Sequence, residues 1–337
     1  MRAQGVFITG GLAVVGLIAA YMTWQREPED TSATATVLDI NKRELEKVRY
    51  EDQTKWLELT RREGEDNGVW VRSGFKELPD AGTPTPLPDG GMPPAPPPKP
   101  PDRTLIGNEV AEKLFQKFAP LQATRALGVV EESKLEELGL KTPVKHLTVT
   151  AHGREEPFDL GTSAIGITSA YARSKDGKVY LLVGGIASEL DMGASRLQDR
   201  RLHTFTSAEY DGLNVTVQGK TREFVVVPGA VPTQNKLAAK SNPSVPDDFT
   251  RNWSQKIWMS SATELLGKGE TPPGGEPTPH FRIDYFRGGK KLGYFEAAPV
   301  GNDVYARTEH TASWVKLQPG GEGILVEADR VMDEARK

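Results

Sequence analysis

Alternating apolar and polar residues dominate the chain beyond residue 30 and predict many short β-strands. Turn-forming Gly, Asn, Asp and Pro residues stand between these runs, which is typical of strands joined by tight connections. Because short connections can join only antiparallel neighbours, the pattern predicts antiparallel meanders. The predicted strands cover 36–40, 55–60, 68–72, 146–151, 158–160, 169–173, 178–183, 213–217 and 223–227.

Other segments repeat apolar residues at intervals of three and four positions, which is the spacing of one helical face. Asn108 is suited to cap the first of them, and Gly139 is suited to end the second in a left-handed conformation. We therefore predict amphipathic helices that cover the strands. They comprise 108–118, 131–138, 189–201, 249–266 and 324–332.

The strand pattern occurs twice. The tripeptide Tyr-Ala-Arg at 171–173 recurs 134 residues later at 305–307, and the flanking strands recur in the same order. An ungapped match over this distance predicts an internal duplication, in which 147–183 and 281–317 fold as equivalent meanders. Because side chains two positions apart share a face of a strand, the alanine of each tripeptide would lie under the helices.

The opposite face of each duplicated strand would carry a candidate partner surface. Its arginines could instead project into water or pair with acidic residues on neighbouring strands. The candidate partner surface consists of Tyr171, Arg173, Tyr305 and Arg307.

The longest apolar run lies near the N-terminus. Residues 5–24 carry no charge, and about 20 such residues are needed for a transmembrane helix. Arg2 precedes the run and an acidic stretch follows it, so the positive-inside bias predicts a cytoplasmic N-terminus and a periplasmic bulk. The predicted localisation is single-pass in the bacterial inner membrane. The alternative is a cleaved signal peptide, since Ala19 and Ala20 are small enough for a signal peptidase.

Small residues recur on one face of this predicted helix. Such a stripe permits close approach of another membrane helix, although Gly and Ala are also frequent in membrane helices in general. The candidate membrane-helix interface consists of Gly5, Thr9, Ala13, Gly16 and Ala20.

Clustered prolines divide the chain. Eleven of the 23 residues from 79 to 101 are proline, which favours a polyproline II spacer. The predicted class is α+β, with an N-terminal transmembrane helix followed by tandem duplicated units of antiparallel β-meander covered by helices. The predicted parts are a cytoplasmic stub 1–4, the transmembrane helix 5–24, a small β piece 31–78 pairing with the first unit, a proline-rich spacer 79–103, a first α+β unit 104–227, a connector 228–246 and a second unit 247–337.

Composition excludes several classes of protein. The 337 residues include 42 Lys and Arg against 46 Asp and Glu, a formal net charge of −4, so the chain lacks the excess positive charge expected of a nucleic-acid partner. It contains no cysteine, which excludes disulfides, thiolate-bound metals and thiol nucleophiles.

The sequences that resemble catalytic motifs lack the required context. The five histidines contain no pair four residues apart, as a helical zinc site would need. The segment 161–166 is one residue too long for a nucleophile elbow, and 219–221 lies between strands rather than before a helix. The segment 199–201, Asp-Arg-Arg, could bind an anion or form a helix-end ion pair. We therefore expect a non-catalytic protein, with no catalytic residues, cofactor or metal.

Parts of the chain resemble a known family. The segment Lys134–Pro143, the alternating strands after it, the Tyr-Ala-Arg strand and the segment Leu197–Leu202 resemble a bacterial domain-of-unknown-function family found beside gliding-motility ABC transporter auxiliary proteins. The resemblance spans Val37–Leu325 and rests on structural rather than catalytic motifs. It implies a single-anchor envelope protein with tandem α+β units, encoded near a transporter permease and ATPase. The proline-rich insertion after Trp70 departs from the family pattern.

These observations and the resemblance lead to two expected functions. The first is a membrane-anchored periplasmic accessory subunit of an ABC-transporter-type or gliding-motility envelope complex, with the permease and auxiliary membrane subunits as partners. The alternative is a periplasmic binding module for an envelope glycan, lipid or protein, with Trp and Tyr on open sheet faces making the contact.

Overall fold

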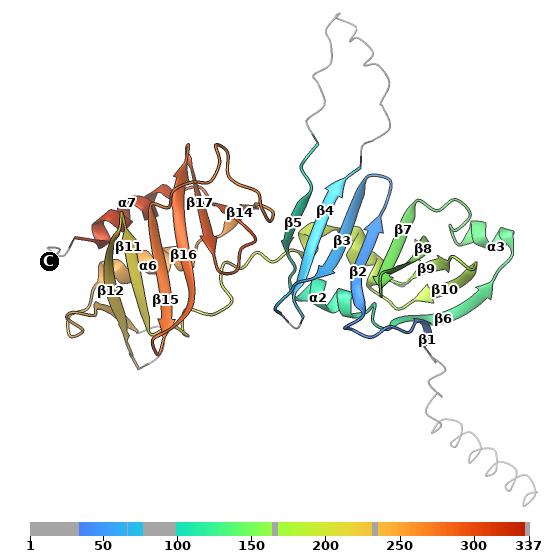
Figure 1. Ribbon diagram of the computed structural model, residues 1–337, viewed down its shortest axis with the longest axis horizontal. Coiled ribbons are helices and arrows are strands. Elements are labelled where there is room, and N and C mark those ends of the chain that lie inside the picture. The colour runs from blue at the N-terminus through green and yellow to red at the C-terminus, as the bar shows by residue number, and fades with distance from the viewer. Residues whose placement is uncertain (1–33, 66, 77–98, 164–167, 231–234, 334–337) are drawn as a thin grey trace, which may run out of the picture.

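Two antiparallel β-sheets organise the molecule, and short helices pack against them (Figure 1). The computed structural model describes residues 34–65, 67–76, 99–163, 168–230 and 235–333. Strands account for 44% of the structure and helices for 17%. The predicted α+β class is therefore wrong, because the protein is mostly β-sheet and its helices are short.

The first sheet has ten strands in the order β1-β6-β10-β9-β8-β7-β2-β3-β4-β5. We refer to this sheet and its helices as the first unit. Its elements are β1 (Ala35–Leu38), β2 (Leu45–Glu51), β3 (Lys55–Arg61), β4 (Val69–Phe75), β5 (Arg103–Ile106), α2 (Glu109–Gln116), β6 (Leu121–Val129), α3 (Glu132–Glu137), β7 (Lys145–Ala151), β8 (Arg154–Ser163), β9 (Ala170–Ser174), β10 (Lys178–Leu182), α4 (Ile186–Met192) and α5 (Ala194–Leu197).

The second sheet has eight strands in the order β13-β12-β11-β15-β16-β17-β18-β14. This sheet and its helices form the second unit. Its elements are β11 (Gly212–Val217), β12 (Lys220–Val227), β13 (Lys236–Ala239), α6 (Asp248–Trp258), β14 (Ala262–Leu265), β15 (Phe281–Arg287), β16 (Lys290–Val300), β17 (Asp303–Thr308), β18 (Val315–Leu317) and α7 (Glu322–Val331).

The two units share one topology. Without the edge strands β1 and β5, the first sheet reads β4-β3-β2-β7-β8-β9-β10-β6, and each strand has a counterpart at the same place in the second sheet. Helix α2 precedes β6 as α6 precedes β14, and α4 follows β10 as α7 follows β18. The internal duplication therefore includes three strands and a helix that lie before the predicted meanders in each unit.

The duplication does not preserve an ungapped register. Leu147 pairs with Phe158, whereas Phe281, which lies 134 residues after Leu147, pairs with Ala297. Strand β16 is longer than β8, and its pairing with β15 shifts register after Tyr285. The order of strands and the alternation of faces are shared, since the alanines at 172 and 306 both lie in the main hydrophobic cores.

The boundary between the units differs from the predicted one. Strands β11 and β12, which the sequence placed at the end of the first unit, belong to the second sheet because β11 pairs with β15 over its whole length. The first sheet is completed instead by β2–β5 from the N-terminal side of the proline-rich segment. Hairpins within each sheet are readable from alternation, but the choice between two neighbouring sheets depends on long-range pairing.

The predicted helix over 189–201 is divided into two. Gly193 has a φ of 75°, a left-handed conformation that ends α4 and permits α5 to begin in a new direction. This break places Leu190 of α4 and Leu197 of α5 in the same hydrophobic core as Leu114 of α2.

No helix among the described residues combines the length and the apolar character needed to cross a bilayer. The longest of them, α6, has 11 residues, against about 20 for a membrane span. The predicted transmembrane helix and the single-pass inner-membrane localisation are therefore corrected. The apolar run 5–24 and its candidate interface, Gly5, Thr9, Ala13, Gly16 and Ala20, lie outside the described residues.

The two units contact each other where β5 approaches β14. Arg103 of β5 forms ion pairs with Glu264 at 2.7 Å and with Glu270 at 3.2 Å. The Lys268 amide donates to the Thr104 carbonyl at 2.8 Å. A Cβ atom on Gly267 would lie only 3.0 Å from the Thr104 nitrogen, so the absence of a side chain permits this close approach.

Candidate functional site

The largest cavity that we find among the described residues lies in the second unit. Its volume is about 480 Å³, within the range of roughly 300–1,000 Å³ that is typical of small-molecule sites. We refer to it as the second-unit cavity. It is lined by Ser207, Ala208, Tyr210, Val226, Asn235, Lys236, Leu237, Arg251, Ser254, Gln255, Trp258 and Met259.

Three parts of the fold build this cavity: the segment before β11, the adjoining ends of β12 and β13, and one face of α6. Asp247 begins the helix, because its side chain accepts a hydrogen bond from the Thr250 amide at 2.9 Å. Trp253 and Ile257 face the core, and Ser254 lies at the boundary between core and cavity. The amphipathic pattern of α6 thus fixes which side chains the cavity receives.

Aromatic side chains form a continuous wall behind the cavity. The ring of Trp258 lies 5.9 Å from Tyr210 and 5.6 Å from Tyr285, measured between centroids. His203 stacks on Trp258 at 4.6 Å with an interplanar angle of 7°. Aromatic contacts of this kind stabilise a preformed apolar surface that does not collapse when empty.

Tyr285 lies at the centre of this wall. Its side chain is fully buried, and its hydroxyl has no hydrogen-bond partner among the described residues. Burial raises the pKa of this hydroxyl well above its ordinary value, so it stays protonated and available as a donor.

A carboxylate holds the stacked histidine in place. Nδ1 of His203 lies 3.0 Å from one oxygen of Glu309 and 3.2 Å from the other. Burial by itself would raise the pKa of Glu309, but the hydrogen bond from His203 and the amide of Tyr294 lower the pKa overall. Glu309 is therefore a charged anchor for the aromatic wall rather than a proton donor.

Cationic groups line the cavity and acidic groups do not. Lys236 at the start of β13 is exposed and has no ion-pair or hydrogen-bond partner within the described part of the chain. Arg251 on α6 has an ion pair with Asp248 at 3.4 Å, and both side chains are substantially exposed. Among the described lining residues there is no Asp, Glu, His or Cys. The cavity therefore combines an aromatic wall with a cationic rim.

A second, much smaller cavity lies in the first unit. Its volume is about 40 Å³, enough for little more than one water molecule. We refer to it as the first-unit cavity. It is lined by Lys42, Leu45, Arg61, Asn67, Gly68, Phe115, Gln116 and Ala119.

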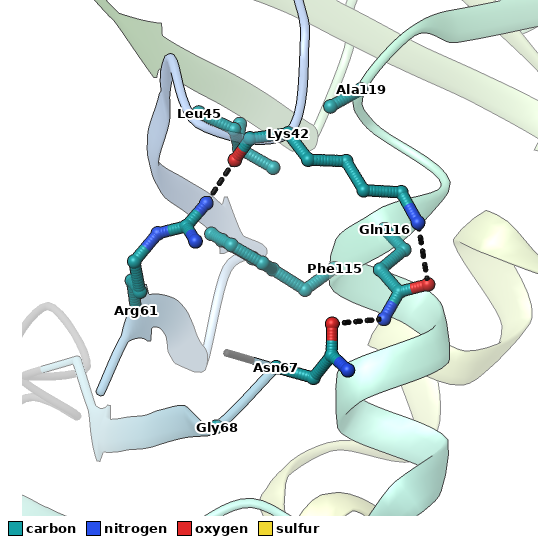
Figure 2. A pocket seen from close by; sticks show the side chains of 8 residues that line it. All are labelled: Lys42, Leu45, Arg61, Asn67, Gly68, Phe115, Gln116 and Ala119. Atoms are coloured by element: carbon teal, nitrogen blue, oxygen red, sulfur yellow. Dashed lines mark hydrogen bonds between the residues drawn. The ribbon is translucent and has the colours of Figure 1, made fainter. Parts of the chain in front are cut away.

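Side chains of the protein itself fill this smaller site (Figure 2). Lys42 Nζ donates to Gln116 Oε1 at 3.1 Å, and Gln116 Nε2 donates to Asn67 Oδ1 at 3.2 Å. The guanidinium of Arg61 donates to the carbonyl of Lys42. Figure 2 shows the ring of Phe115 reaching from α2 into the space between these groups.

The candidate partner surface of the first unit is covered. Tyr171 packs against the cluster of Leu138, Leu140 and Val179, beside α3. Arg173 is paired with Asp159 of the neighbouring strand at 2.7 Å. This is the cross-strand pairing that was the alternative for the arginines.

The equivalent positions of the second unit are also covered. Tyr305 is 4% exposed and packs with Leu266 and Trp314. Arg307 lies between Glu296 and Glu276, with ion-pair distances of 2.7 Å and 2.9 Å. The tyrosine and arginine of each strand do share a face, but neither pair lies on an open sheet surface.

The Asp-Arg-Arg segment contributes to the contact between units. Asp199 is nearly buried, and Arg201 Nη2 lies 2.6 Å from its carboxylate, as the ion-pair alternative predicts. The other partner, His310, comes from the second unit and places Nε2 2.9 Å from Asp199 Oδ2. Because these groups satisfy the carboxylate, the segment is not an open anion site.

Sequence reasoning missed the second-unit cavity. Its aromatic wall comes from the segment 203–210, α6 and β15, which are far apart in the sequence and carry no spacing motif. One available signal was Ser254, a small polar residue at a position where the apolar stripe of α6 calls for a large one.

Comparison with known proteins gives one partial match. The model of a domain of unknown function (DUF4340) matches residues 106–255, from the end of β5 to near the end of α6. No curated protein sequence matches the chain, and no solved structure matches it. The match therefore begins in the first unit, ends in the second and includes part of the cavity lining. Residues 106–255 of this chain are a DUF4340 domain, a domain of unknown function.

Proposed function

We propose that this protein is a non-catalytic binding module, and that its ligand is a small molecule held in the second-unit cavity. The observation that carries the proposal is the cavity itself, about 480 Å³ behind a rigid aromatic wall. Small-molecule sites are typically apolar cavities of this size with a few convergent polar groups. Here those groups are supplied by Lys236, Arg251 and Gln255.

Binding is favoured over catalysis by the chemistry of the described lining residues. Acid–base and nucleophilic catalysis use a carboxylate, imidazole, thiol or activated hydroxyl beside the substrate. The hydroxyl of Ser254 is engaged with the Arg251 carbonyl at 2.9 Å, and no general base lines the cavity among the described residues. An accessory role beside a gliding-motility transporter permease stays a prediction from the resemblance alone.

The proposal predicts local binding of an aromatic anion. We expect anilinonaphthalene sulfonate to bind the folded chain, because its rings suit the aromatic wall and its sulfonate suits the cationic rim. Titration monitored by amide chemical shifts should move the signals of 207–210, 235–237 and 251–259 together. The signals of the first-unit cavity, including those of Asn67 and Gln116, provide the internal control and should stay in place.

Saturating probe that leaves the cavity signals unchanged would contradict the proposed function. A dye signal accompanied by shifts throughout both units would also contradict it, since it would report binding to loosened structure instead of a site.

A further inference from the structure

The duplication provides a direct comparison of the two cavities. When the helix caps Asn108 and Asp247 are aligned, the buried residues of α2 and α6 coincide. The three buried pairs outside the cavities are Ala111 with Thr250, Leu114 with Trp253, and Phe118 with Ile257.

The two cavities occupy the same place in the fold. The first-unit cavity lies between the segment before β2, the adjoining ends of β3 and β4, and the last turns of α2. The second-unit cavity lies between the segment before β11, the adjoining ends of β12 and β13, and the last turns of α6. Since β2, β3, β4 and α2 are the counterparts of β11, β12, β13 and α6, the sites are duplicates.

One substitution separates the filled site from the open one. In the helix alignment, Phe115 corresponds to Ser254, and both residues line their cavities. The benzyl group fills the first unit, whereas a hydroxymethyl group leaves that space empty in the second. The next residue is glutamine in both helices, and in the first unit this residue, Gln116, binds Lys42 and Asn67.

We infer that the ligand of the second-unit cavity is a small aromatic anion. Its ring takes the place that the Phe115 ring holds in the first unit, against Trp258 and Tyr210. Its anionic group lies at the cationic rim, where Lys236 and Arg251 reach it and the Gln255 amide orients it. This inference rests on the proposed function and adds the class and the pose of the ligand.

Returning the missing ring to the second unit tests the pose. The probe is naphthoate, with binding measured by calorimetry on the full chain. Ser254→Phe should lower its affinity at least tenfold, because the new side chain occupies the space of the ligand ring. The matched control is Lys256→Gln on the same helix, since Lys256 pairs with Glu327 at 2.5 Å and does not line the cavity. Thermal unfolding verifies that each variant is folded.

The charge of the ligand is tested separately by variants at the exposed rim, which leave the core untouched. Lys236→Gln combined with Arg251→Gln should weaken naphthoate about tenfold, since charge-assisted hydrogen bonds are lost. The same double variant should leave the neutral analogue naphthalene methanol unchanged. This arm decides the anionic class even if Ser254→Phe fails to fold.

The outcomes separate this inference from the proposed function. If naphthoate shifts the cavity signals but neither Ser254→Phe nor the rim variant weakens it, the inferred ligand class and pose are wrong and the binding function stands. If the neutral analogue binds as tightly as naphthoate, the anionic assignment is wrong. If no probe perturbs the cavity, the proposed function fails and the inference fails with it.

Discussion

Replacing Trp253 with alanine should destabilise the second unit by about 3–5 kcal/mol, the usual cost of removing a large aromatic side chain from a core. Trp253 is 1% exposed and contacts the ring of Phe281 at 5.1 Å. Its indole Nε1 also donates to the Ile324 carbonyl at 2.9 Å, which joins α6 to α7. Chemical denaturation monitored by circular dichroism measures the change in the free energy of unfolding.

Asn252 provides the matched control for this substitution. It is the preceding residue of α6 and is exposed, so Asn252→Ala should change stability by less than about 0.5 kcal/mol. A loss below about 1 kcal/mol for Trp253→Ala would mean that α6 does not pack on the second sheet as described.

The second large effect is expected at Asp199. Its replacement by alanine should cost roughly 2–4 kcal/mol, because His310 keeps a buried ring nitrogen without its partner. The Asp199 amide is itself bound to the Ile106 carbonyl at 2.7 Å in the first unit, and His310 belongs to the second. The variant should therefore weaken the contact between units, measured as increased protease cleavage within 199–211.

The same carboxylate predicts a dependence on pH. Burial would raise the pKa of Asp199, but hydrogen bonds from His310 and Arg201 hold the pKa well below its ordinary value of 3.8. A carboxyl group with a lowered folded pKa stabilises the protein above its unfolded pKa, and this contribution disappears as the pH falls below about 4. Denaturation curves should therefore show a shallower loss of stability below this pH for Asp199→Asn than for the wild type. Equal slopes for the two proteins would contradict the assigned pairing.

Much of the local structure was predictable from the sequence. Alternation in segments such as 146–151 and 213–217 predicted strands that the structure contains as β7 and β11. The repeated Tyr-Ala-Arg tripeptide predicted two meanders of the same order, and the structure confirms that order. These features were accessible because they depend on side-chain period and nearby turns.

The errors came from features that local patterns do not determine. Alternation cannot assign β11 to one sheet or the other, since that choice depends on its pairing with β15 about 70 residues later. The expected open surface around Tyr305 is covered by Leu266 and Trp314, which belong to connecting segments. A strand face is therefore readable from sequence, whereas what covers the face is a tertiary property.

The candidate site was hidden for a related reason. Its distinguishing feature is the exchange of Phe115 for Ser254, and this exchange has meaning only after the two helices are recognised as duplicates. The sequence match through the meanders did not extend to α2 and α6, because the proline-rich segment and a register shift separate the repeats by different lengths.

The central claim, that the second-unit cavity holds an aromatic anion, is tested most directly by crystallography of the full chain with naphthoate. We predict density for the rings against Trp258 and above Ser254, and for the carboxylate within hydrogen-bond distance of Lys236 or Arg251. An empty second-unit cavity at saturating naphthoate, or ligand density only at other places on the molecule, would contradict the account.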